Sequence, residues 1–194
     1  MTEAKSREGA TLTKLDDKSI LSGGSRANQD VYEFVARTDQ TNITAIRLEA
    51  LKDASLPGRG PGRSDNANFV LTEIELEAGS VLEPATRETV KSAGAIADFS
   101  QSGFDVARAI DGDPKTGWAV DVPNRKKSGV AWFIAAKPFG FSGGTELRFR
   151  LRFESTFERH ALGRARLALS IDPAATQPGP LFASEITEIL AVVE

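Results

Sequence analysis

Cysteine is absent from the 194 residues, and histidine occurs once. Without cysteine the chain forms no disulfide, no zinc–thiolate site and no covalent haem attachment, and it has no thiol nucleophile. A single histidine also disfavours a Ser-His-Asp triad and a histidine-based zinc site. These absences turn the search for function away from the commonest catalytic and metal centres.

The chain also lacks an excess of basic charge and long apolar runs, and it has few aromatic residues. The formal net charge is −3, so no basic excess points to nucleic acid. No apolar run approaches the roughly 20 residues that span a bilayer, which predicts no membrane insertion, and residues 1–9 lack the apolar stretch of a signal peptide. Aromatic residues make up 7% of the chain, which is few for a polysaccharide-binding surface.

Short alternating apolar and polar segments, separated by turns, predict β-strands along most of the chain. The clearest is 145–154, where every second residue is apolar and most residues between them are arginine. Nothing supplies the crossover helices of a parallel α/β fold, so the sequence predicts an all-β sandwich or jelly roll. The predicted strands are 30–38, 43–51, 69–78, 90–99, 130–135, 145–154 and 163–171.

Two segments interrupt the alternation. Residues 52–68, rich in Gly, Pro, Arg and Asn, predict a long loop of the kind that often carries function. Further on, Leu71 and Ile74 both favour the core but lie three residues apart. This slip predicts a bulge at Thr72 and Glu73.

The C-terminal segment is the one good helix candidate. Residues 181–193 predict a helix that Ser184 caps, with an apolar stripe formed by Ile186, Ile189 and Leu190. The predicted boundaries are 1–9 for a tag-like or disordered start, 10–175 for the sandwich, and 176–194 for a linker and this terminal helix.

Segment 107–118, ARAIDGDPKTGW, carries the most chemistry. Asp111 and Asp113 lie two residues apart on a turn, and Thr116 follows. Ca²⁺ takes 6–8 oxygen ligands from carboxylates, hydroxyls and carbonyls. Gly112 lets the chain turn sharply enough to aim carbonyls inward. The alternative is an ordinary Asp-Gly turn in which Asp111 hydrogen-bonds its own backbone.

The stretch AIDGDPKTGW resembles the signature of discoidin-like (coagulation factor type C) domains and of carbohydrate-binding modules with the same galactose-binding-like jelly roll. The resemblance implies a structural Ca²⁺ in this loop and a core position for Trp118. The implied ligands are the carbonyls of Arg108 and Asp113, the side chain of Asp111, and the carbonyl and hydroxyl of Thr116.

The same resemblance implies a further glutamate ligand at an Ala/Ser/Thr-Glu-Ile step. Two steps fit, at Glu73 and at Glu185. We favour Glu73, because a bulge in its strand would turn the side chain toward the loop, whereas Glu185 falls in the first turn of the predicted helix. In the family this strand follows the Asp-Gly loop, whereas Glu73 precedes it.

A second resemblance covers roughly residues 10–175. It is to a discoidin-like or carbohydrate-binding-like module of large planctomycete proteins that carry cytochrome c domains, and it implies a fragment of an exported, periplasmic or envelope-associated protein. The matching segments are LDDKSIL, TNITAIRLEAL, LPGRGPGRSDNANFVLTEIEL, DFSQSGFDVARAIDGDPKTGW and LGRARLALSI.

Further residues are candidates for ligand contact. The basic loop tip at Asn124, Arg125 and Lys126 suits the loop-end site common in such sandwiches, with a solvated loop as the alternative. Trp132 is a candidate sugar-stacking ring or a packed residue at the sandwich edge. Arg159 and His160 fall in a turn, where a hydrogen-bonded turn residue is the alternative to ligand contact.

Arginines at alternate positions of 145–154 and 163–171 predict a ladder on two neighbouring strands. The ladder comprises Arg148, Arg150, Arg152, Arg164 and Arg166. Guanidinium groups suit an anionic polysaccharide. The favoured alternative is a solvated face balanced by Glu73, Glu75 and Glu77 on a paired strand.

Together these patterns predict a non-catalytic carbohydrate-binding module with one structural Ca²⁺, inside a larger protein. The expected partners are a glycan and the neighbouring domains, with no nucleic acid. The alternative is a spacer or protein-interaction domain that positions neighbouring redox domains. No pair of carboxylates is placed across a cleft by the sequence, so enzymatic activity is not expected.

Overall fold

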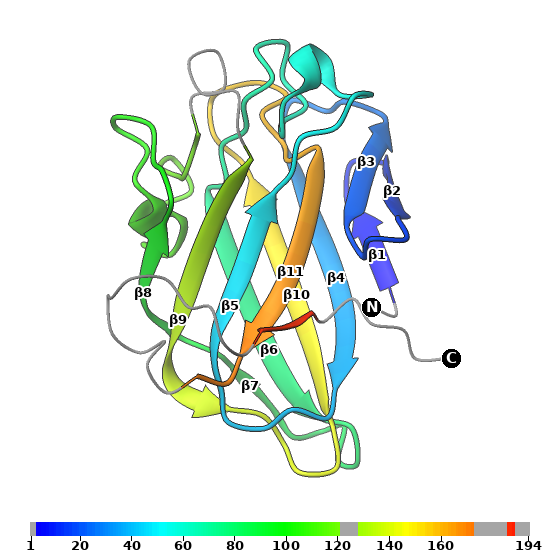
Figure 1. The fold of residues 1–194 in the computed structure, drawn as a ribbon, viewed down its shortest axis with the longest axis vertical. Helices are drawn as coiled ribbons and strands as arrows, with labels where there is room; N and C mark the ends of the chain where they lie inside the picture. Colours follow the sequence, from blue (N-terminus) through cyan, green and yellow to red (C-terminus); the bar gives the residue numbers. More distant parts are fainter. Residues whose placement is uncertain (1–2, 121–127, 173–185, 189–194) are drawn as a thin grey trace.

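The computed structural model describes residues 3–120, 128–172 and 186–188, which form two antiparallel sheets packed face to face (Figure 1). The first sheet runs in the order β1 (Glu3–Ser6), β4 (Asp30–Thr38), β10 (Thr145–Phe153), β6 (Glu73–Ser80) and β7 (Arg87–Thr89). The second runs in the order β2 (Ala10–Lys14), β3 (Ile20–Gly24), β11 (Arg164–Ser170), β5 (Ile43–Ala50), β9 (Gly129–Phe139) and β8 (Ser92–Ala97). The predicted β-sandwich is therefore confirmed.

The core lies between the sheets and is built from the predicted alternation. In β10, Leu147, Phe149 and Leu151 are at most 1% exposed, and the arginines between them lie on the outer face. In the opposite sheet, Leu48 of β5 and Leu167 of β11 are buried in the same cluster. Removing these apolar surfaces from water is the main force that holds the two layers together.

Residues 3–6 belong to the first sheet. They form β1, which pairs with β4 from Glu3↔Val35 to Ser6↔Tyr32. No helix in the described part of the chain is long and apolar enough to cross a membrane.

The predicted bulge at Thr72 and Glu73 lies at the start of β6, where both residues face Arg152: the backbone N–H of Thr72 donates to the carbonyl oxygen of Arg152 at 2.8 Å, and Glu73 is the register partner of Arg152. The register between β6 and β10 runs without a shift from Glu73 to Ser80, and the strand begins at Glu73 instead of residue 69. Phe69, Val70 and Leu71 are all buried in succession, and Leu71 forms an isolated bridge with Trp118. The slip in the pattern therefore marks the start of the strand.

The predicted C-terminal helix is wrong at residues 186–188. These form β12 (Ile186–Glu188), which pairs with residues 168–170 of β11. Along the same edge of β11, β3 pairs with residues 164 and 165, so β12 supplies hydrogen-bond partners further along that edge. Ile and Thr are also residue types that favour strands. Ser184, Ile189 and Leu190 lie outside the described residues.

Three loops gather toward one end of the sandwich, at the top of Figure 1. They are 52–72, which contains η1 (Pro57–Arg59), 98–118, which contains η2 (Val106–Ala109), and 154–163. Hydrogen bonds join all three: the Asn68 amide donates to Gln101, and the backbone of Val70 donates to that of His160. These loops, together with Glu73 at the start of β6, form both candidate sites.

Candidate functional site

Two consecutive Asx turns shape the loop after η2. The backbone N–H of Asp113 donates to Oδ1 of Asp111 at 2.9 Å, and that of Lys115 donates to Oδ1 of Asp113 at 3.0 Å. Gly112 has φ +80°, a conformation that few side chains tolerate. The turn hydrogen bond expected of Asp111 under the alternative interpretation is thus present. It occupies one of the two carboxylate oxygens of Asp111.

The other carboxylate oxygen of Asp111 belongs to a cluster centred on Thr116. The Thr116 hydroxyl lies 2.8 Å from Oδ2 of Asp111, 3.3 Å from the carbonyl oxygen of Arg108 and 3.3 Å from that of Asp113. A hydroxyl donates one hydrogen, so it satisfies only one of these three acceptors at a time. The backbone N–H of Thr116 also donates to the carbonyl oxygen of Asp113 at 3.1 Å, so Oδ2 of Asp111 and the carbonyl oxygen of Arg108 compete for the hydroxyl hydrogen.

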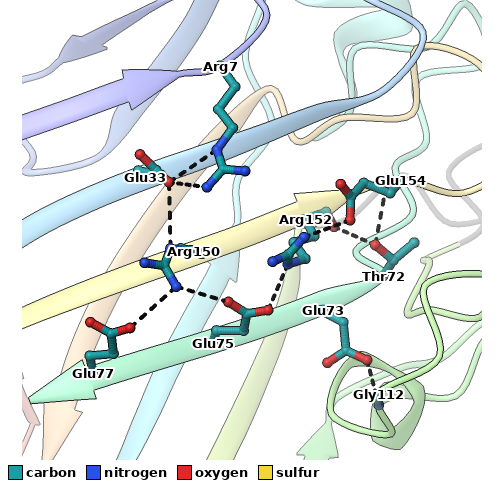
Figure 2. A network of polar contacts seen from close by, with 10 residues as sticks. All are labelled: Arg7, Glu33, Thr72, Glu73, Glu75, Glu77, Gly112, Arg150, Arg152 and Glu154. Carbon is teal, nitrogen blue, oxygen red and sulfur yellow. Dashed lines mark hydrogen bonds and ion pairs between the residues drawn. The ribbon is translucent and has the colours of Figure 1, made fainter. Parts of the chain in front are cut away.

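Glu73 reaches this loop from the first residue of β6. Its Oε1 accepts a hydrogen bond from the backbone N–H of Gly112 at 2.6 Å, and the side chain points away from the neighbouring ion pairs of the sheet (Figure 2). The structure thus brings all five predicted ligands, Arg108, Asp111, Asp113, Thr116 and Glu73, to one loop. Glu185 lies outside the described residues.

Electrostatics at Glu73 favour a positive partner. Burial is the main cause that raises the pKa of Glu73, and the negative charges of Asp111 and Glu75 raise it as well. The N–H of Gly112 and the charge of Arg152 lower this pKa, but the net shift is upward. A raised pKa means that the folded protein disfavours the carboxylate form. A cation beside the Glu73 carboxylate would offset this penalty.

The donor set fits a hard cation better than a transition metal. Its members are carboxylate, hydroxyl and carbonyl oxygens, which are the ligands of Ca²⁺. Within the described residues no three His, Cys, Asp or Glu side chains form a metal-binding group. The set here holds two carboxylates, and its other oxygens come from a hydroxyl and the backbone.

The other predicted contact residues are scattered. Trp132 is 3% exposed and lies under the guanidinium of Arg47, 5.8 Å from the ring centroid, so it presents no ring face to a sugar. Asn124, Arg125 and Lys126 lie outside the described residues.

Arg159 and His160 lie at the loop end of the sandwich. Arg159 forms an ion pair with Asp65 at 3.6 Å, and Nδ1 of His160 lies 2.8 Å from the carbonyl oxygen of Glu158. His160 lines a hollow of about 130 Å³ together with Asn66, Asn68, Gln101, Phe104 and Phe157. Sequence analysis missed these five, although the amide-rich segment SDNAN was a usable signal.

The arginine ladder is wrong as a single surface, because β10 and β11 lie in different sheets. On the first sheet, Arg150 pairs with Glu33, Glu75 and Glu77, and Arg152 pairs with Glu75 and Glu154 (Figure 2). On the second, Arg164 pairs with Asp17 and Asp53, and Arg166 pairs with Glu49. The first sheet matches the alternative of a charge-balanced face at Glu75 and Glu77, whereas Glu73 accepts from Gly112 instead.

A larger hollow of about 650 Å³ lies beside β4 and is lined mostly by polar residues. Its buried carboxylate, Asp30, accepts hydrogen bonds from the Ser6 hydroxyl at 2.6 Å and from the backbone of Val31 at 2.7 Å. Asp30 therefore joins β1 to β4, which accounts for its burial in structural terms.

Comparison of the chain with protein-family models, with curated proteins and with solved structures finds no match.

Proposed function

We propose that this chain is a non-catalytic carbohydrate-binding domain in which the loop 108–116 and Glu73 hold one structural Ca²⁺. The observation that carries the proposal is the cluster of three acceptor oxygens around the single hydroxyl of Thr116. The galactose-binding-like jelly roll implied by the discoidin-like signature fits an antiparallel sandwich with its loops gathered toward one end. The glycan function rests on that resemblance and on the loop end.

In this proposal the cation supplies charge neutralisation and no chemistry. Asp111 and Glu73 would hold it from different parts of the chain, and the carbonyls of Arg108 and Asp113 with Thr116 would complete the oxygen set. Since the ligands come from both β6 and the loop after η2, binding joins segments that are otherwise connected here by the hydrogen bond from Gly112 to Glu73.

Calcium is expected to raise the melting temperature of the domain. At a free concentration of 100 times the Kd, binding to the folded state alone contributes about 2.7 kcal/mol. Asp111→Asn and Glu73→Gln should each remove most of this response, because each takes a carboxylate from the set. Thermal unfolding followed in millimolar calcium and in chelator measures the effect.

Asp105→Asn is the matched control for calcium. Asp105 accepts from the backbone of Ala107 at the start of η2 but lies outside the oxygen set, and asparagine keeps that acceptor. This variant should respond to calcium like the unaltered protein. Identical melting of the unaltered protein in calcium and in chelator would overturn the calcium site.

The glycan function is tested by a glycan array probed with the folded protein, with calcium and again with chelator. The expected result is reproducible binding to one class of polysaccharide, competed by its free sugar. A blank array from a well-folded sample contradicts this function.

The second candidate is a spacer or protein-interaction domain that positions neighbouring redox domains of an exported, envelope-associated or periplasmic protein. The ion-paired outer face of the first sheet favours it, since the charges of Arg150 and Arg152 are already balanced by glutamates of the same sheet. A blank glycan array is the result expected from this candidate.

A further inference from the structure

The hollow lined by Asn66, Gln101 and His160 is formed where the three loops meet. Its walls are tied together by backbone hydrogen bonds: Val70 donates to His160, Gln101 donates to Ala119, and Phe104 donates to Gln101. Because these bonds join segments 70, 101–104, 119 and 160, the hollow is held in shape before any ligand arrives. Preformed walls reduce the ordering cost of binding.

The side-chain amides of Asn66 and Gln101 in the hollow have N–H donors that are not used within the described residues. Oδ1 of Asn66 accepts from the hydroxyl of Ser64 at 2.5 Å and from the backbone of Asn68 at 3.1 Å, and Oε1 of Gln101 accepts from the Asn68 amide at 2.8 Å. With both oxygens engaged, the amide orientations are set. In the part of the chain that the structure describes, neither the Asn66 nor the Gln101 NH₂ group has a hydrogen-bond acceptor.

His160 complements these donors with an acceptor. A carbonyl oxygen only accepts hydrogen bonds, so Nδ1, 2.8 Å from that of Glu158, carries the proton in the neutral ring. Nε2 of the same ring is then an acceptor. The hollow therefore offers donors and an acceptor together, which matches hydroxyl groups because each hydroxyl both donates and accepts.

Phe157 supplies an apolar face beside these polar groups. It is 49% exposed, and its ring lies 5.7 Å from that of Phe104 and 5.7 Å from that of His160. A large phenyl ring left half in water, yet fixed by two ring neighbours, is a preformed surface for an apolar ligand face. The C–H face of a sugar ring has this character.

The size and charge of the hollow narrow the ligand class. Its volume of about 130 Å³ is well below the roughly 300–1,000 Å³ of pockets that enclose drug-sized ligands, so it fits one ring that enters from solvent. Among the described residues that line the hollow, none is Asp, Glu, Lys or Arg. A sulfated or carboxylated sugar would find no counter-charge among them.

We infer that this hollow binds one uncharged pyranose ring at the end of a glycan, with Phe157 against its C–H face and Asn66, Gln101 and His160 on its hydroxyls. The inference rests on the proposed carbohydrate function and names the site and ligand class for it. It assigns the specificity to the loop end instead of the arginines of the first sheet.

Because the chain has a single histidine, ligand binding at the hollow can be measured directly by nuclear magnetic resonance. Because His160 is the only histidine, its imidazole ¹H–¹⁵N signals need no assignment, and the indole signals of the two tryptophans provide internal references. The probes are the methyl glycosides of galactose, glucose, mannose and N-acetylglucosamine, with methyl glucuronide as the charged comparison. At least one neutral glycoside should shift the His160 signals, and methyl glucuronide should not.

Substitutions then locate the contact. Phe157→Ala and Gln101→Ala should each weaken binding of the responding glycoside by about tenfold or more, since each removes one of the ligand contacts. Phe99→Ala is the matched control, because Phe99 is also a partly exposed phenyl ring, 36% exposed, but does not line the hollow. The affinity of the Phe99→Ala variant for the responding glycoside should be unchanged.

The outcomes separate the two proposals. Binding on the glycan array that leaves the His160 signals unmoved and survives Phe157→Ala would overturn this site while the carbohydrate function stands. A response only to methyl glucuronide would overturn the neutral-ligand assignment. No binding to any array glycan or methyl glycoside would overturn both the site and the function.

Discussion

Replacing Trp118 with alanine is expected to lower the free energy of unfolding by about 3–5 kcal/mol. The side chain is fully buried, and its ring packs edge-to-face on Phe69 with centroids 5.1 Å apart. Its indole N–H also donates to the carbonyl oxygen of Phe99 at 3.0 Å, so the truncation leaves that acceptor unpaired as well as opening a cavity. Chemical denaturation at equilibrium measures the change.

Leu82→Ala is the control for Trp118→Ala. Leu82 is 71% exposed, so its truncation should change the free energy of unfolding by no more than about 0.5 kcal/mol. A loss at Trp118 as small as that at Leu82 would contradict the packing of the loop 98–118 against the core.

Gly62→Ala is expected to cost about 3 kcal/mol or more, at the upper end for overpacking. A Cβ atom at Gly62 would lie 1.8 Å from the carbonyl oxygen of Asn68 and 2.2 Å from its carbonyl carbon, and both are backbone atoms that no rotamer change moves. The turn is already closed by the hydrogen bond from Gly62 to Ala67 at 2.9 Å. The backbone of 62–68 must therefore shift.

Gly94→Ala provides the matched control, because a Cβ atom there meets nothing within 4 Å and Gly94 lies in a strand. Comparison of the two variants in denaturant separates the clash from the general effect of replacing glycine. Equal stability of both would refute the close approach of Gly62 to Asn68. Since Asn68 fixes the Gln101 amide, Gly62→Ala should also weaken glycoside binding at the hollow.

The sequence predicted the sandwich well because its strongest signal is local. In β10 the burial of every second side chain follows directly from the letters, since the period of a strand is two. Segment 186–188 shows the limit of this method. Three residues are too few for their periodicity to separate a helix from a strand, and the pairing of Ile186–Glu188 with β11 is not visible in the sequence.

The two candidate sites also differ in how far apart their residues lie in the sequence. Most of the oxygen cluster lies within nine residues, 108–116, so its spacing in the sequence is enough to predict it. Only the glutamate ligand required a choice, between the Thr-Glu-Ile step at Glu73 and the Ser-Glu-Ile step at Glu185. The hollow joins Asn66, Gln101 and His160 from three distant loops. No spacing rule connects such residues, and only the packing of the loops brings them together.

The position of β10 and β11 at the interior of their sheets has a consequence for synthesis. β10 separates β4 from β6, and β11 separates β3 from β5, so these earlier strands have no contact with each other across the sheet until the last third of the chain is made. Until β10 and β11 are made, β3, β4, β5 and β6 lack these native neighbours. Such late, non-local pairing slows folding and exposes strand edges to association. Completion of both sheets is therefore a late step in the folding of this domain.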